Sequence, residues 1–398
     1  MIRLISLLLA LLLLTGCAAA PAAPETTVPE VSLPPLTSTP AETTLPPETA
    51  LPPDPMDLLI ADMTLEQKVG QLFIVSPEQL LPGVGPLSAM SATLGEAIFQ
   101  YPVGGIILFG DNILSPAQLE AFNQELRLAC EIPPFLAVDE EGGTVARLAR
   151  NDAFDLPRYK NAAAVAASGD PSDVLEMGQT IGAYLSRYEF NLDFAPVADV
   201  NTNPGNPVIG KRAFSSDPET AAAMAAAFAR GLRENGVIAT YKHFPGHGDT
   251  AQDSHSTLAV SNRTLEELMQ TEFLPFLAAE STDMIMVGHI ALPNVTGDMT
   301  PSTLSYRVVT EILKGDLGFS GLVVTDSMQM GAITDACSPG EAAVAALAAG
   351  CDIILLPEDL PEAFHAVIAA VEDSRLSMDW LDATVRRILE FKELHGIL

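Results

Sequence analysis

The sequence predicts an α/β protein whose folded part is a single (β/α)8, TIM-like barrel. Short runs of Val, Ile, Leu, Phe and Met recur along residues 56–398, and amphipathic helical patterns lie between them. Nearly continuous apolar runs are typical of strands that are buried on both faces of a parallel sheet. Eight such runs alternating with helices over this length favour a closed barrel, with a doubly wound open sheet as the second choice.

The expected elements follow from these patterns in chain order. The eight strands are predicted at Leu72–Val75, Gly105–Phe109, Phe135–Val138, Leu192–Phe194, Ala239–Lys242, Met284–Val287, Leu322–Thr325 and Ile353–Leu356. The clearest helices are predicted at Ser172–Tyr188, Pro218–Asn235, Thr264–Glu280 and Met378–Leu394. Ser172 and Thr264 are expected to be N-caps, because a side-chain hydroxyl can accept a hydrogen bond from a free N–H of the first helical turn.

Residues 1–17 have the pattern of an export signal. Arg3 is followed by an apolar run from Leu4 to Leu14, which is shorter than the ~20 residues that span a bilayer. The run ends in the sequence LTGC at Leu14–Cys17, which resembles a bacterial lipobox. The resemblance implies that Cys17 is lipidated and that the protein is exported and anchored to the extracytoplasmic face of a bacterial membrane.

Residues 18–55 are rich in Pro, Thr, Ala and Glu and contain few large apolar side chains. A segment of this composition cannot bury enough apolar surface to fold, and we expect a disordered linker. The sequence is thus divided into a signal peptide (1–17), a linker (18–55) and one barrel domain (56–398).

The charge of the chain is strongly negative, with 51 Asp and Glu against 20 Lys and Arg, for a net charge of -31. Such a surface repels nucleic acid and anionic lipid headgroups, so neither is an expected partner. We therefore expect contact with the membrane only through the lipid anchor. Nothing in the sequence indicates an oligomeric state.

Polar side chains follow several of the predicted strands directly. Asp139 follows the third strand, Lys242 and His243 close the fifth, His289 follows the sixth and Asp326 follows the seventh. Because active sites of such barrels lie at the carboxyl ends of the strands, these residues are expected to share one site.

The densest of these clusters is the segment Lys242–His255, which reads KHFPGHGDTAQDSH. Its glycines and proline indicate a loop, and three interpretations remain open from spacing alone. Its His and Asp side chains can form a metal site, or Asp253 and His255 can act as an orienting carboxylate and a proton-transferring imidazole, or the loop can simply solvate the barrel mouth. Three roles likewise remain open for Asp326 from the sequence alone, namely nucleophile, metal ligand or helix cap.

These segments together resemble glycoside hydrolase family 3, and within it the bacterial β-N-acetylhexosaminidases. The resemblance covers residues 57–398. Lys242–His255 is its most specific part, and the other matching segments are DEEGGTVAR at Asp139–Arg147, NLDFAPVADV at Asn191–Val200, IGKRAF at Ile209–Phe214 and VTDSM at Val324–Met328.

The resemblance implies an enzyme: a retaining, exo-acting glycosidase that releases terminal β-linked N-acetylglucosamine, for example from peptidoglycan fragments. Asp326 would be the nucleophile, His255 the general acid/base and Asp253 the carboxylate that orients its imidazole. Five residues match positions that bind the terminal sugar, namely Asp139, Arg147, Arg212, Lys242 and His243. No metal and no other cofactor is implied.

Other functions of the same fold are a phosphorylase that transfers the sugar to phosphate, and a β-glucosidase. The wider family includes β-glucosidases whose acid/base is supplied by a second domain. The sequence ends soon after the last predicted helix, so the loop histidine is expected to serve here. A metallohydrolase and a non-catalytic sugar-binding lipoprotein are further alternatives.

The match to the family pattern is incomplete in the third loop. The family usually reads DQEGGR where this chain has Glu140 and Thr144 in place of the Gln and the Arg. Gaining a carboxylate and losing an arginine is expected to change what lies beyond the terminal sugar.

Overall fold

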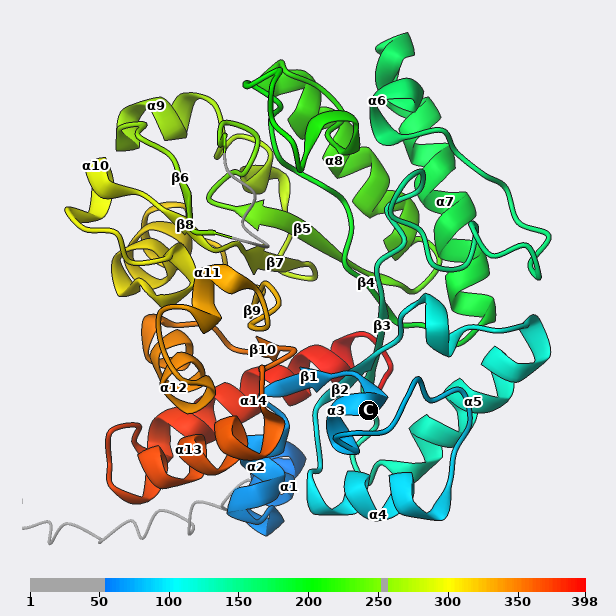
Figure 1. Cartoon of the computed structure of the whole chain (residues 1–398), viewed down its shortest axis with the longest axis vertical. Helices are drawn as coiled ribbons and strands as arrows, with labels where there is room; N and C mark the ends of the chain where they lie inside the picture. The colour runs from blue at the N-terminus through cyan, green and yellow to red at the C-terminus, as the bar shows by residue number, and fades with distance from the viewer. Residues whose placement is uncertain (1–53, 252–256) are drawn as a thin grey trace, which may run out of the picture. The chain divides into compact units, whose positions relative to one another are not determined.

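Eight parallel strands form the centre of the domain in the computed structural model, which describes residues 54–251 and 257–398 (Figure 1). Neighbouring strands follow the order β10-β1-β2-β3-β4-β5-β7-β9. Their bounds are β1 Phe73–Val75, β2 Gly105–Ile107, β3 Phe135–Val138, β4 Leu192–Asp193, β5 Ile238–Phe244, β7 Met284–Val287, β9 Leu322–Thr325 and β10 Ile354–Leu355. All eight predicted strands are confirmed, with ends that differ by a few residues.

The ring of strands closes between β9 and β10. Val324 forms a parallel bridge with Ile353, and the N–H of Thr325 donates to the carbonyl of Ile353 at 3.0 Å. The closed barrel is therefore confirmed over the open sheet.

Helices surround the strands (Figure 1). The α-helices are α1 Pro55–Asp62, α2 Leu65–Gly70, α3 Pro77–Leu80, α4 Ala92–Gln100, α5 Pro116–Ala129, α6 Ala162–Val165, α7 Pro171–Arg187, α8 Pro218–Arg233, α9 Leu265–Gln270, α10 Pro293–Thr296, α11 Gly331–Thr334, α12 Pro339–Ala349, α13 Leu360–Glu372 and α14 Met378–Leu394. Short 3-10 turns lie at η1 Gly110–Asn112, η2 Ala166–Ser168, η3 Gly210–Arg212, η4 Phe276–Ala278 and η5 Ser302–Leu304, and a π-helix at η6 Arg307–Asp316.

Two helix predictions need correction at their ends. The N-cap of α7 is Asp170 and not Ser172, because the Asp170 carboxylate accepts the hydrogen bond from the N–H of Ser172. Thr264 does cap α9 through a capping box with Glu267, but the helix ends at Gln270 and not at Glu280. Pro275 is incompatible with a continuous helix to Glu280, since proline lacks the N–H that a continuing helix needs.

The core lies on both sides of the strands. Every residue of β1, β2, β3, β7 and β9 is buried, as expected for a parallel sheet that helices cover on its outer face. Around the ring, α7 and α8 pack so closely that a Cβ on Gly178 would lie 2.3 Å from the carbonyl oxygen of Phe228. Glycine at this position lets the two helices approach.

A second, smaller pair of strands stands apart from the barrel sheet. β6 (Ala259–Val260) runs parallel to β8 (Ile290–Ala291), just after the barrel strand β7. The pair fixes the chain that follows residue 256 next to the carboxyl end of β7. Among the described residues, no helix is long and apolar enough to cross a membrane.

One lysine is buried near the amino ends of the strands. Lys392 of α14 donates to the side-chain oxygen of Gln71 at 2.8 Å, and its Nζ lies 4.9 Å from the ring centroid of Phe135. Neither of these two partners is a carboxylate that would stabilise the ammonium, and burial lowers the pKa of Lys392 to about 7.

We predict that Lys392 makes the stability of the protein rise with pH between about 7 and 10. In this window the unfolded lysine still holds its proton and the folded one has released it. The free energy of unfolding therefore gains up to ~1.4 kcal/mol per pH unit from this group. Lys392→Met should flatten the rise relative to wild type in denaturant titrations at several pH values. Lys160→Met, at an exposed lysine, is the control. Parallel curves for Lys392→Met and wild type would contradict the prediction.

Candidate active site

A cavity of about 660 Å³ opens at the carboxyl ends of the barrel strands. All six described residues that the sequence singles out as catalytic or sugar-binding line it, and the structure thus brings them together: Asp139, Arg147, Arg212, Lys242, His243 and Asp326. They come from the loops after β3 and β4, from the end of β5 and from the residue after β9. This is the end of a (β/α)8 barrel at which active sites are found.

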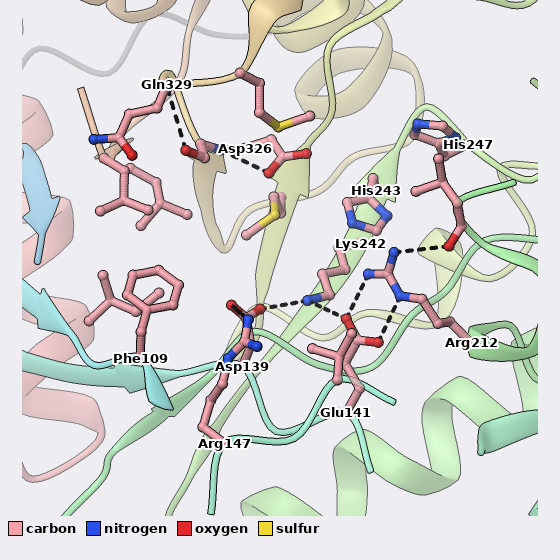
Figure 2. Close-up of a pocket in the computed structure, with 18 of the residues that line it drawn as sticks. Phe109, Asp139, Glu141, Arg147, Arg212, Lys242, His243, His247, Asp326 and Gln329 are labelled. Atoms are coloured by element: carbon pink, nitrogen blue, oxygen red, sulfur yellow. Dashed lines mark hydrogen bonds and ion pairs between the residues drawn. The ribbon is translucent and has the colours of Figure 1, made fainter. Parts of the chain in front are cut away.

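Lys242 lies at the centre of the charged side of this cavity (Figure 2). Its Nζ is 2.8 Å from Oδ1 of Asp139 and 2.8 Å from Oε1 of Glu141, and its side chain is only 3% exposed. Burial opposes the charge, but the two carboxylates outweigh this effect and raise the pKa of Lys242. The ammonium therefore stays protonated and holds two loop carboxylates in place.

Glu141 is shared between Lys242 and Arg212. The Arg212 guanidinium binds it with two bonds, from Nε to Oε2 at 2.9 Å and from Nη2 to Oε1 at 2.7 Å. Although Glu141 is buried, the two cations hold the pKa of its carboxyl well below its usual range. A bidentate pair of this kind fixes the plane of the guanidinium and so orients Arg212.

Arg147 is held less tightly. Its Nη2 lies 3.5 Å from Oδ2 of Asp139, and its guanidinium lies over the ring of Phe109, 5.5 Å from the centroid. One long polar contact leaves most of its five N–H donors available for a ligand in the cavity.

His243 is oriented by a buried carboxylate. Its Nδ1 lies 2.7 Å from Oδ2 of Asp199, whose Oδ1 also accepts hydrogen bonds from the backbone N–H groups of His243 and His247. His243, together with the hydrogen bonds that Asp199 accepts, keeps the pKa of this carboxyl low despite burial. An imidazole held at Nδ1 presents its Nε2 in a fixed direction.

Asp326 lies apart from the Asp139–Lys242–Glu141 cluster, and the open cavity separates them (Figure 2). Its Oδ1 accepts a hydrogen bond from the backbone N–H of Ser327 at 2.8 Å. Burial alone would raise the pKa of Asp326, but the electrostatic influence of His243, His289 and Lys242, with this hydrogen bond, lowers it. Asp326 is therefore an ionised carboxylate that faces the cavity.

His289 supports the strand end that carries Asp326. This histidine is buried, and its Nε2 lies 2.9 Å from the carbonyl oxygen of Ser327 while its Nδ1 lies 2.7 Å from the hydroxyl of Thr303. It does not line the cavity itself. Its position after the sixth barrel strand is as the sequence predicts, and it contacts the turn after Asp326.

Asp253 and His255 lie outside the described residues, as does Cys17. Their predicted roles therefore stay predictions. Among the residues that the structure does describe, no three His, Cys, Asp or Glu side chains converge as a metal site requires. His247 donates through its backbone N–H to Asp199, and its ring Nδ1 lies 2.8 Å from the Thr250 hydroxyl.

Sequence reasoning missed two carboxylates of the site, Glu141 and Asp199. Both lie inside segments that match the family pattern, but only their ion pairs with residues far along the chain reveal what they do.

The structure also corrects the interpretation of the third loop. Glu140 is fully buried and does not line the cavity, so the gained carboxylate cannot act beyond the terminal sugar. Thr144 does line the cavity.

Comparison with known proteins gives a consistent picture. Residues 64–391 match the profile of the glycosyl hydrolase family 3 N-terminal domain. The chain is 33% identical over 333 residues to beta-hexosaminidase A of Pseudoalteromonas piscicida, covering 77% of this chain and 56% of that relative. It is 38% identical over 274 residues to a beta-hexosaminidase of Stenotrophomonas maltophilia, covering 67% of this chain and 80% of that relative.

A solved structure is similar over most of the chain. The glycoside hydrolase family 3 beta-N-acetylglucosaminidase from Paenibacillus sp. str. FPU-7 aligns with a TM-score of 0.78 and 37% identity, over 84% of this chain and 63% of that one. The chain thus spans less than two thirds of the length of the Paenibacillus and Pseudoalteromonas proteins.

The Lys242 cluster yields a test of the site's electrostatics. Lys242→Met should lower the free energy of unfolding by ~3–5 kcal/mol, because it removes the buried cation that Asp139 and Glu141 share and leaves Asp139 with only its long contact to Arg147. Adding Asp139→Asn to this variant should recover part of the loss, because Asp139 loses its 2.8 Å partner while Glu141 keeps Arg212. Denaturant unfolding at pH 7 measures both, and Lys211→Met, at an exposed lysine next to the site, is the control. Equal stability of the Lys242→Met and Lys211→Met variants would show that the cluster is not held together by this charge.

Proposed function

The chain belongs to glycoside hydrolase family 3, and from this premise we propose that it is a glycosidase, namely a retaining, exo-acting β-N-acetylhexosaminidase. Its substrates would be glycosides with a terminal β-linked N-acetylglucosamine, such as peptidoglycan fragments. The observation that carries the proposal is the ionised Asp326 facing a cavity whose other side holds the Asp139–Lys242–Glu141 cluster. The names of the Stenotrophomonas and Paenibacillus relatives support the choice of sugar.

Asp326 serves as the nucleophile in this proposal. A carboxylate with a lowered pKa is ready to attack the anomeric carbon, forming a glycosyl–enzyme bond as the bond to the leaving oxygen breaks. The donors and acceptors that bind the hydroxyl and acetamido groups of the same sugar ring come from Asp139, Arg147, Arg212, Lys242 and His243. Water then cleaves the glycosyl–enzyme and restores the original configuration.

His255 serves as the general acid/base, with Asp253 orienting it. The assignment rests on the sequence match of Lys242–His255. The described start of this loop supports it, because His247 lines the cavity and is held by Asp199. In the first step His255 gives its proton to the leaving oxygen, and in the second it removes a proton from water. Neither step requires a metal ion.

The charge of the cavity favours water over phosphate as the acceptor. Lys242 and Arg212, two of the three Lys and Arg side chains that line it, are already closely paired with the carboxylates of Asp139 and Glu141. Phosphate binding would need cationic donors that are not neutralised in this way.

The site of action in this proposal is the outer surface of the cell. Leu4–Leu14 followed by LTGC at Leu14–Cys17 supports export and lipidation of Cys17, and the composition of residues 18–55 supports a tether between anchor and barrel. Such an anchor would place the cavity within reach of cell-wall glycans.

Substrate choice and nucleophile can be tested together. Wild type should hydrolyse an aryl β-N-acetylglucosaminide with retention, and much faster than the matching β-glucoside. Asp326→Asn should lower kcat by roughly 10³-fold or more while folding is unchanged. A 2-fluoro or 5-fluoro glycoside should leave its sugar on the peptide that contains Asp326. Labelling of Asp139, or inversion of configuration, would refute the nucleophile.

The acid/base role of His255 predicts a dependence on the leaving group. A nitrophenolate leaves without protonation and a sugar alkoxide does not. His255→Ala should therefore slow a natural disaccharide by ~10²–10⁴-fold and a dinitrophenyl glycoside far less. Azide should partly restore turnover where deglycosylation limits the rate, and Asp253→Ala should show the same pattern more weakly. His365→Ala, at an exposed histidine of α13, is the control. Equal losses on both substrates would mean that His255 is not the general acid.

Lipidation of Cys17 is tested by labelling cells with a fatty acid. Wild type and the control Cys337→Ala should carry the label, and Cys17→Ala should not. Label that persists on Cys17→Ala would disprove the anchor.

A further inference from the structure

Glu140 lies next to the sugar-binding residues but turns away from the cavity. Its carboxylate is fully buried and accepts hydrogen bonds from the backbone N–H groups of three successive residues: Arg147 at 2.5 Å, Leu148 at 2.9 Å and Ala149 at 2.9 Å. The hydroxyl of Tyr184, from α7, donates to the same carboxylate at 2.8 Å. Each carboxylate oxygen thus accepts two hydrogen bonds.

These bonds join the start of an irregular loop to its middle. β3 ends at Val138 and the next helix, α6, begins at Ala162, so no helix or strand orders the chain between them. Glu140 stands at the start of this loop and draws residues 147–149 back to it. The backbone N–H of Glu140 in turn donates to Oδ1 of Asp193 at 2.9 Å, which ties the start of the loop to β4.

The loop sends its consecutive glutamates in opposite directions. Glu141 points into the cavity toward Lys242 and Arg212, and Glu140 points into the protein. The chain then reverses at Gly142 and Gly143, whose φ angles of 73° and 101° are strained for other residues. The turn lets Arg147 come back beside Asp139.

A carboxylate suits this position better than an amide. Three partners of Glu140 are backbone N–H groups, which can only donate, and the Tyr184 hydroxyl donates as well. An ionised carboxylate has acceptors only and suits all four. A glutamine would place its NH₂ group against a backbone N–H or against Tyr184. Bonds from N–H to a charged acceptor are also about twice as strong as neutral ones.

We propose that Glu140 is a positioning residue that sets the placement of Asp139 and Arg147, and through them the affinity of the site for the terminal sugar. The proposal rests on the proposed function, because it assigns sugar binding to those two residues. Glu140 itself touches no substrate. It acts through the backbone of residues 147–149.

The test is a double-mutant cycle between Glu140→Gln and Arg147→Ala, measured with an aryl β-N-acetylglucosaminide. In the wild-type background Glu140→Gln should lower kcat/KM by about ten- to hundredfold, mainly through a higher KM. The factor by which kcat/KM falls should be the same for good and poor leaving groups, since the loop holds the sugar and not the aglycone. In the Arg147→Ala background Glu140→Gln should cost less than threefold, because its effect acts largely through Arg147.

Two further variants keep the result interpretable. Tyr184→Phe removes one donor but keeps the carboxylate, and it should raise KM by a smaller factor. Glu176→Gln, at an exposed glutamate on the same helix α7, should match wild type. Thermal unfolding of each variant shows that the assays are run on folded protein.

The outcomes separate the two proposals. A folded wild type that is inactive on the N-acetylglucosaminide would overturn the proposed function. An active wild type whose kcat/KM is unchanged in Glu140→Gln would overturn the positioning role alone. If Glu140→Gln lowers kcat/KM by the same factor in the wild-type and Arg147→Ala backgrounds, the positioning role is also overturned. An equal factor would mean that the effect of Glu140 does not act through Arg147. If Glu140→Gln does not fold, an unchanged KM in Tyr184→Phe decides against the proposal.

Discussion

The buried ammonium of Lys242 is the interaction on which the site depends. It lies 2.8 Å from both Asp139 and Glu141, and all three charges are largely removed from solvent. None of them could be buried alone, because an unpaired charge in the protein interior costs several kcal/mol. The end of β5 and the loop after β3 therefore have to meet in one arrangement. Arg212 completes it by binding both carboxylate oxygens of Glu141 and bringing in the loop after β4.

Other buried carboxylates hold loop groups in a similar way around the rim of the barrel. Asp199 holds His243 and the backbone of His247, and Glu140 holds three N–H groups of its own loop. In each case a buried carboxylate with several donors fixes a group that the loop alone would leave free. These carboxylates hold parts of the loops in place, whereas Asp326 is an ionised carboxylate that faces the cavity from its own strand end. That separation of tasks is what allows one acidic residue among several to act as a nucleophile.

The barrel supplies the geometry that makes such pairing available. Parallel strands end at one rim, so side chains that follow β3, β4, β5 and β9 converge although they lie up to 187 residues apart in the chain, from Asp139 to Asp326. The similarity to family 3 structures, with a TM-score of 0.78 for the Paenibacillus enzyme, agrees with this arrangement. The chain's own departure from the family pattern, Glu140, lies behind the rim and supports the loop from within.

The sequence by itself determined the eight strands, because an apolar run buried on both faces is a local pattern that needs no knowledge of its neighbours. It also placed Asp139, Lys242, His243 and Asp326 at strand ends, and the family resemblance added Arg147 and Arg212. Only the tertiary structure decided that the sheet closes between Val324 and Ile353. The tertiary structure alone also determines which groups Glu140, Glu141 and Asp199 each bind. Arg212 and Glu141, for example, lie 71 positions apart in the sequence. Their ion pair forms only when the folded barrel brings the two charges together away from water.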